Sequence, residues 1–183
     1  MKHAVLLIVL FCATGVSVSA QDAYPRAELF GGYSHFRADP IRLDSPDARK
    51  GANGFGVSFA GNLNSKIGLV AELSAHHGSL DVFQLERDWN TYTFLFGPRF
   101  SARGSTVTGF GHVLLGGVQS NIENFQRGTH FALAFGGGLD VKASRMVAVR
   151  IVQADYIVER HRFEGWFGDF RLQSGIVVRF GNR

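Results

Sequence analysis

The chain has 183 residues, a formal net charge of +4 at pH 7 and 45% hydrophobic residues, enough for one domain with a large apolar surface or core. Its 19 Lys and Arg are scattered along the sequence, which argues against a nucleic-acid partner. The 17 Phe and 23 Gly beside 4 Pro favour strands over helices, and the single cysteine excludes a disulfide within the chain.

The first residues have the pattern of a secretory signal peptide. Lys2 gives a weakly positive start, residues 4–13 form a short apolar run, and small residues precede a cleavage position after Ala20. The apolar run is too short to cross a bilayer as a helix, and no later run approaches about 18 residues. We predict a cleaved signal peptide at residues 1–20 and an exported domain at residues 21–183.

Alternation of apolar with other residues at a period of two dominates the exported domain. In segment 91–100, for example, Tyr92, Phe94 and Phe96 alternate with Thr, Leu and Gly, and the apolar set carries no charge. The same pattern recurs in four further segments, which are 54–63, 67–76, 131–141 and 170–180. Each of these segments is predicted to be a strand with one apolar face.

Three further strands are less regular. Segment 27–36 opens the exported domain, and segment 107–118 is apolar on both faces, so its facing stays open. Segment 146–158 contains Arg150, and its alternation falters near Asp155-Tyr156, which indicates a bulge or the rim of a sheet.

The connections between these strands alternate in length. Three are short, at 64–65, 101–106 and 142–145, and four are longer and richer in charge, at 37–53, 77–90, 119–129 and 159–168. Short periplasmic turns and long outer loops are typical of outer-membrane barrels, which close because an open sheet edge in hydrocarbon leaves backbone groups unpaired. We predict an all-β fold, an eight-stranded antiparallel up-and-down transmembrane β-barrel.

Alternation alone does not say whether the apolar face meets lipid or fills the interior. Many partner positions are Gly or Ala, and small residues fit the narrow interior of an eight-stranded barrel, which favours an apolar exterior. The opposite facing would make a soluble, lipocalin-like periplasmic barrel that binds a ligand. That alternative predicts a protein that stays in solution without detergent.

The end of the chain and several strands carry a family resemblance. Residues Gln173, Gly175, Val178 and Phe180 have the polar-Gly-apolar-aromatic spacing of the C-terminal signal that the barrel assembly machinery reads in bacterial outer-membrane barrels. Segments 28–34, 131–141 and 154–156 resemble strands of the OmpA-like eight-stranded barrel superfamily. The resemblance implies a Gram-negative outer-membrane location, a polar packed interior, and a role as structural anchor, adhesin or narrow pore.

An apolar exterior turns the charged partner positions inward. We predict that they form a salt-bridge network in the lumen, with Glu28 beside Arg179 where the first and last strands meet; the alternative is separate hydration in a wet lumen. The predicted lumen residues are Glu28, Glu72, Arg99, Arg150, Arg171 and Arg179.

The predicted long loops are rich in arginine, which binds phosphate groups through paired hydrogen bonds. These residues are candidates for contact with lipopolysaccharide, against the alternative of ordinary solvated charge. They are Arg42, Arg49, Lys50, Arg87, Arg127, Arg160 and Arg162. Trp89, Tyr92, Tyr156 and Trp166 are expected in an aromatic girdle near the outer strand ends.

An enzymatic interpretation rests on one short motif. His77 and Ser79, with Glu72 or Glu86 as the acid, faintly resemble the His-x-Ser of lipid A deacylases. The tripeptide is common, so we expect no catalytic residue, no metal site and no cofactor. We predict a monomeric, non-catalytic outer-membrane barrel that contacts outer-membrane lipid and lipopolysaccharide. Its role would be membrane integrity, adhesion or limited passage of small solutes. The alternatives are a lipid A-modifying enzyme and the soluble ligand-binding barrel.

Overall fold

The computed structural model describes residues 24–37, 51–82, 85–122, 126–161 and 165–182. The predicted signal peptide at residues 1–20 lies outside these ranges. Within them, no helix is long and apolar enough to cross a membrane.

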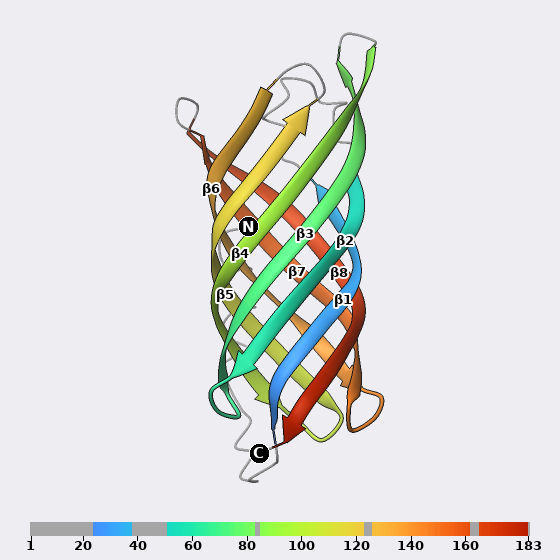
Figure 1. Cartoon of the computed structure of the whole chain (residues 1–183), viewed down its shortest axis with the longest axis vertical. Coiled ribbons are helices and arrows are strands. Elements are labelled where there is room, and N and C mark those ends of the chain that lie inside the picture. Colours follow the sequence, from blue (N-terminus) through green and yellow to red (C-terminus); the bar gives the residue numbers. More distant parts are fainter. Residues whose placement is uncertain (1–23, 38–50, 83–84, 123–125, 162–164, 183) are drawn as a thin grey trace, which may run out of the picture.

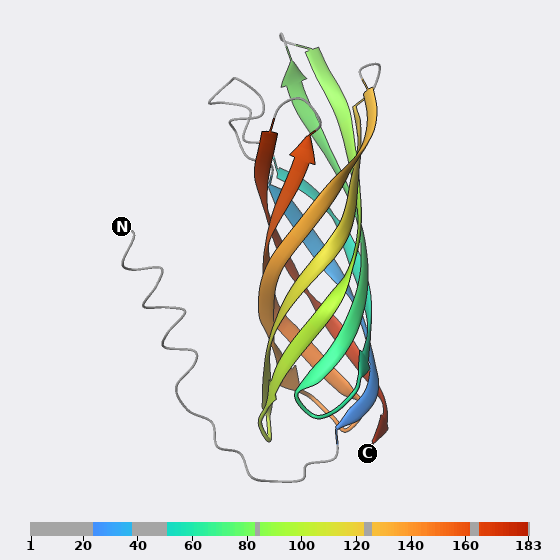
Figure 2. The same ribbon diagram turned by 90° about the vertical axis from the view of Figure 1, so that its left-hand side faces the viewer.

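Eight antiparallel strands follow one another around a closed barrel, and the last strand pairs with the first (Figures 1 and 2). All eight predicted strands are present, and most extend beyond their predicted ends. The strands are β1 (Pro25–Arg37), β2 (Gly51–Asn62), β3 (Ile67–Val82), β4 (Leu85–Arg103), β5 (Val107–Ile122), β6 (Gln126–Lys142), β7 (Val147–His161) and β8 (Gly165–Asn182).

The barrel has two distinct ends. Short connections join β2 to β3, β4 to β5 and β6 to β7 at one end, near the start of β1 and the end of β8; we call this the turn end (Figure 1). The turns are closed by backbone hydrogen bonds such as Gly104 N to Val107 O at 2.8 Å. The opposite end, where β3 meets β4 and β5 meets β6, is the loop end.

The outer face is an apolar belt. On β4, Tyr92, Phe94 and Phe96 are each about half exposed, at 48%, 47% and 51%, while the intervening Thr93 and Leu95 are buried. The same alternation holds around the barrel, so the lipocalin-like alternative, with the aromatic face inward, is wrong. On β5, whose facing stayed open, Val113 and Leu115 point outward and Leu114 points inward.

A β-bulge interrupts the alternation of β7, but not where the sequence suggested. Ile151 and Val152 are consecutive and both exposed, at 56% and 39%, and the pairing of β7 with β6 and with β8 shifts at this point. Beyond the bulge, Asp155 points inward and Tyr156 outward in regular order. The extra residue restores the charged positions to the lumen on both sides of the bulge.

The strands are longer at the loop end than predicted. Residues 78–82 of β3 and 85–88 of β4 pair with one another beyond the last β2 partner of β3, which is Asn53, and the last β5 partner of β4, which is Ile122. The hairpin therefore rises above its neighbours (Figures 1 and 2). The expected loops at 77–90, 119–129 and 159–168 are mostly strand.

Candidate functional site

The lumen holds the charged side chains. Five of the six predicted lumen residues are almost fully buried, and the sixth, Arg179, is partly exposed near the turn end; the buried five are Glu28, Glu72, Arg99, Arg150 and Arg171. They point inward because they occupy the strand positions that alternate with the apolar belt.

A first group of ion pairs lies on the turn-end side; we call it the turn-side cluster, formed by Glu28, Arg99, Arg103, Asp140 and Arg150. Arg99 Nη1 and Arg103 Nη1 donate to the two oxygens of Glu28 at 2.8 Å and 2.7 Å. Arg150 Nε donates to Asp140 Oδ1 at 2.8 Å, and Arg99 Nη2 reaches Asp140 Oδ2 at 3.4 Å. The cluster ties together β1, β4, β6 and β7.

Two phenylalanine rings pack against the guanidinium groups of this cluster. The guanidinium carbon of Arg150 lies 4.3 Å from the ring centre of Phe30 and 4.4 Å from that of Phe110, and that of Arg99 lies 4.2 Å from Phe110. Such cation–π contacts are strongest where water is excluded. The two phenylalanine rings place apolar atoms in the lumen between the ion pairs.

A second group, the central cluster, is formed by Glu72, His112, Gln153, Asp155 and Arg171. Arg171 is fully buried, and its Nη2 donates to Asp155 Oδ2 at 2.7 Å and to Glu72 Oε1. His112 Nε2 donates to Asp155 Oδ1 at 2.8 Å. The cluster therefore joins strands β3, β5, β7 and β8 through the middle of the barrel.

Gln153 connects the two clusters. Its side-chain oxygen accepts from Arg150 Nη1 at 2.6 Å, and its Nε2 donates to Glu72 at 3.0 Å and to Asp155 at 2.9 Å. The buried charges therefore form one continuous hydrogen-bonded network. Removing one member of such a network leaves its partners buried and unsatisfied.

One predicted pair meets in register but not through its charges. Glu28 and Arg179 are backbone partners across the β1–β8 seam, as expected. The Glu28 carboxylate nevertheless makes its ion pairs with Arg99 and Arg103 on β4. The tilt of the strands brings the side chains of Arg99 and Arg103 across the lumen to Glu28.

Sequence reasoning missed the acids that hold the arginines. Asp140 and Asp155 are both fully buried and accept hydrogen bonds from Arg150 and Arg171. Asp140 occupies an inward position of a regular strand, so the alternation of that strand could have predicted its place in the lumen. The bulge at Ile151 hid the facing of Asp155.

Toward the loop end, aromatic side chains pack inside the lumen beside buried polar groups. The ring of Phe36 packs against that of His76 at a tilt of 40°, with centroids 5.2 Å apart, and meets Trp89 edge-on at 6.0 Å. Ser34 Oγ and His76 Nε2 share a hydrogen bond of 2.7 Å beside them. Trp89, expected in an outer girdle, is 5% exposed and points inward, so that expectation was wrong.

The edge of the belt at the loop end is polar on the outer face. His35 Nδ1 and the hydroxyl of Tyr33 hydrogen bond to Asn53 Oδ1 at 2.8 Å and 2.6 Å, and His77 Nδ1 bonds Asn90 Oδ1 at 2.8 Å. These residues form a row across β1 to β4 in register. Tyr92 and Tyr156 face outward as the girdle prediction required, and the Trp166 side chain lies outside the described residues.

The candidate lipopolysaccharide residues are mostly beyond what the structure describes. Arg160 is an exposed residue of β7, and the side chains of the other six, Arg42, Arg49, Lys50, Arg87, Arg127 and Arg162, lie outside the described residues. The possible catalytic acid Glu72 points into the lumen while His77 points outward from the same strand. The two side chains are separated by the barrel wall, and those of Ser79 and Glu86 are not described.

The residues of the C-terminal signal lie on both faces of β8. Gln173 is buried and donates from Nε2 to Glu72 Oε1 at 3.2 Å, so it belongs to the lumen network. Phe180 is 45% exposed on the belt, Val178 is half-buried beside it, and Gly175 lies on the inner side against β1.

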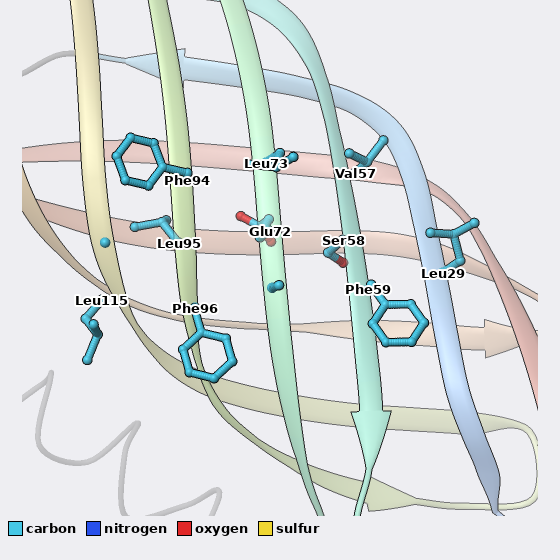
Figure 3. Close-up of a pocket in the computed structure, with 12 residues that line it drawn as sticks. Leu29, Val57, Ser58, Phe59, Glu72, Leu73, Phe94, Leu95, Phe96 and Leu115 are labelled. Carbon is cyan, nitrogen blue, oxygen red and sulfur yellow. The ribbon is translucent and has the colours of Figure 1, made fainter. Parts of the chain in front are cut away.

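A shallow hollow interrupts the belt on its outer face. Small Ala71 lies between larger neighbours, and Figure 3 shows Phe59, Phe96 and Leu73 around the depression, which measures about 470 Å³. Its walls are apolar, so it faces hydrocarbon in a membrane. Within the described residues, no three His, Cys, Asp or Glu side chains are grouped so that they could hold a metal ion.

A closed barrel with an apolar belt outside and paired charges inside is an integral membrane β-barrel, because the closed ring of paired strands leaves no open sheet edge in the hydrocarbon. The chain has the fold of the eight-stranded outer-membrane barrels. Together with the apolar belt, this fold places the protein in the outer membrane.

Solved structures of this fold include surface proteins of Gram-negative bacteria. Ail, the attachment invasion locus protein of Yersinia pestis crystallised with the heparin analogue sucrose octasulfate, is 18% identical with a TM-score of 0.57; the match covers 84% of this chain and 99% of that chain. Neisserial surface protein A is 11% identical with a TM-score of 0.66, covering 87% and 100% of the two chains. OprG from Pseudomonas aeruginosa is 11% identical with a TM-score of 0.59, covering 86% and 97%.

No family model and no curated protein matches the chain. The identities to the solved structures are low, so the likeness shows the fold.

Proposed function

We propose that the protein is a non-catalytic outer-membrane anchor that presents its loop end at the cell surface, and that it conducts no ions through its lumen. The observation that carries this proposal is the bridging of the lumen by Arg171, which contacts Glu72 on β3, Asp155 on β7 and Thr93 on β4. A passage for solutes would have to break this buried network.

The length of the strands supports a surface role. A strand that crosses a membrane needs about 9–11 residues. β4 has 19 residues and its outward apolar series runs from Tyr92 to Phe100, so the rest of its outer half extends beyond the belt. The β3–β4 hairpin thereby supplies a strand-paired projection on the side that we assign to the exterior.

Two measurements on the intact protein test this proposal. An epitope inserted between Val82 and Leu85 should be labelled on intact cells, whereas one inserted after Gly104 at the turn end should be labelled only after the outer membrane is opened. The purified protein should show no discrete conductance steps in planar bilayers. Steps in the unaltered protein, or the reverse labelling, contradict the proposal.

Contact with lipopolysaccharide is a second candidate function. The polar row from His35 to Asn90 and the exposed Arg37 and Arg160 lie beyond the apolar belt at the loop end, which is the level of lipid headgroups if this end faces outward. Ail, which shares the fold, was crystallised in complex with the heparin analogue sucrose octasulfate, so a barrel of this fold can bind a polyanion.

The test compares binding to vesicles with and without lipopolysaccharide. Replacing the seven candidate residues with Gln should weaken the preference for lipopolysaccharide, because arginine side chains pair with its phosphates. Arg26→Gln, which removes an exposed charge at the turn end, is the matched control. An unchanged preference in the sevenfold variant contradicts this function.

Catalysis by the His77 motif receives no support from the geometry. Glu72 and His77 lie on opposite sides of the barrel wall, and His77 Nδ1 is bonded to Asn90. A general base needs its orienting acid within hydrogen-bond reach. His77→Ala should therefore leave the lipid A of expressing cells unchanged, and a loss of deacylated lipid A in this variant would contradict the proposal.

A further inference from the structure

The turn end of the lumen carries more positive than negative charge. Four guanidinium groups, from Arg99, Arg103, Arg150 and Arg179, face the two carboxylates of Glu28 and Asp140. Both oxygens of each carboxylate already accept hydrogen bonds from Arg99, Arg103 or Arg150. Arg179, which lies on the inward side of β8 opposite Glu28 in register, adds a further charge to the group.

Several donors of these guanidinium groups are buried without an acceptor among the described residues. They are Nε of Arg99, Nη2 of Arg103, and both Nε and Nη2 of Arg179. The Arg99 side chain is 3% exposed, so water reaches it poorly. Buried donors are nearly always paired in proteins, and a charged donor left unpaired is more costly than a neutral one.

The side chains that carry the unpaired donors lie near the turn end, although the donor atoms themselves are buried. Arg103 is the last residue of β4 and its side chain is 12% exposed, and Arg179 near the end of β8 is partly exposed. Beyond them, the rings of Phe30 and Phe110 pack against the guanidinium group of Arg150. A small anion that enters from the turn end would meet Arg103 and Arg179 before it reached the central cluster.

We propose that the turn end of the lumen is a binding site for a phosphate-type oxyanion, held by Arg103 and Arg179 with Arg99 behind them. Guanidinium groups match the geometry of phosphate oxygens through paired, charge-assisted hydrogen bonds. The ligand is inorganic phosphate or the phosphate group of a small ester. One bound oxyanion offsets the surplus charge and supplies acceptors to the unpaired donors.

The site is tested by ligand-dependent stability of the full chain, isolated from the outer membrane in a nonionic detergent that carries no phosphate. The unfolding temperature, followed by heat-modifiable gel mobility, should rise saturably with inorganic phosphate and exceed the rise in sodium chloride of equal ionic strength. A ligand that binds the folded state alone produces such a shift. A parallel titration with glycerol phosphate shows whether the site also binds phosphate esters.

Arg179→Gln is the decisive variant, because no carboxylate among the described residues forms an ion pair with Arg179 and would be left unpaired. Half-saturation by phosphate should require roughly tenfold more ligand, while without phosphate the variant should be at least as stable as the parent. Arg103→Gln should weaken binding in the same way, and Arg145→Gln, in the exposed β6–β7 turn, should not. A phosphate effect no larger than that of chloride, or one unchanged in Arg179→Gln, overturns the proposal.

Discussion

Arg171 on β8 and Glu72 on β3 are joined by a hydrogen bond across the lumen, although their strands are not neighbours in the sheet. Arg171 also donates to Asp155 on β7 at 2.7 Å, and its side chain is fully buried. A guanidinium held between two buried carboxylates keeps all three groups paired in a place that water reaches poorly. The loss of any one leaves an uncompensated charge inside the barrel.

Arg171→Gln should therefore lower the free energy of unfolding by about 3–5 kcal/mol, the usual effect of breaking a buried ion pair. The measurement is urea unfolding of the barrel in phospholipid vesicles. Glu72→Gln should also destabilise, and the double variant should lose less than the sum of the two, because the second change removes a partner that is already unpaired. Arg145→Gln should change stability by less than about 0.5 kcal/mol. Strictly additive effects would show that the pair is not coupled.

Because the apolar belt faces lipid, the stability cost of an introduced charge should depend strongly on its position along the barrel. Leu73 is 59% exposed in the middle of the outer apolar series of β3, so Leu73→Arg should cost about 2–4 kcal/mol in phospholipid vesicles. Met146, which is 60% exposed in the β6–β7 turn, lies beyond the membrane, so Met146→Arg should cost about 0–1 kcal/mol. Equal losses in the two variants would contradict the assigned belt.

The strands were predictable because the belt imposes a period of two on every crossing. Their outer ends were not, because beyond the belt the outward positions become polar and the pattern no longer separates strand from loop. Residues 78–82 and 85–88 are the clearest case, since their pairing depends on the partner strand rather than on facing lipid. Trp89 was misplaced because aromatic type alone does not reveal its face.

Alternation also predicted which charges enter the lumen, but not which of them meet. Glu28 is opposite Arg179 in register, yet its carboxylate pairs with Arg99 on β4 because the tilt of the strands sets the contacts across the interior. The inward facing of Asp155 was not predicted, because one extra residue at Ile151 shifts the alternation of β7. Contacts across a barrel depend on tilt and bulges together, which a single strand pattern does not contain.

The closing seam between β1 and β8 depends on two glycines that approach each other closely. A Cβ placed on Gly32 would lie 2.7 Å from the Cα of Gly175, and one on Gly175 would lie 2.5 Å from the Cα of Gly32. Gly32→Ala and Gly175→Ala should each destabilise the barrel by about 1–3 kcal/mol, because the backbone of the facing strand must move. Gly31→Ala, where an added Cβ meets nothing within 4 Å, is the matched control and should be neutral. A similar loss at Gly31 would show that the close approach of the two glycines is not the cause.

The inward facing of Trp89 predicts that lipid does not touch it. Trp89 is 5% exposed and packs edge-on against Phe36, whereas Tyr92 on the same strand is 48% exposed on the belt. In a Trp166→Phe background, Trp89 fluorescence should be nearly insensitive to lipids brominated near the headgroup. The matched variant, with Trp89→Phe and Tyr92→Trp in the same background, should be strongly quenched, because its indole meets the brominated chains directly. Equal quenching of the two proteins would place Trp89 on the outer face and remove the aromatic packing that fills the loop end of the lumen.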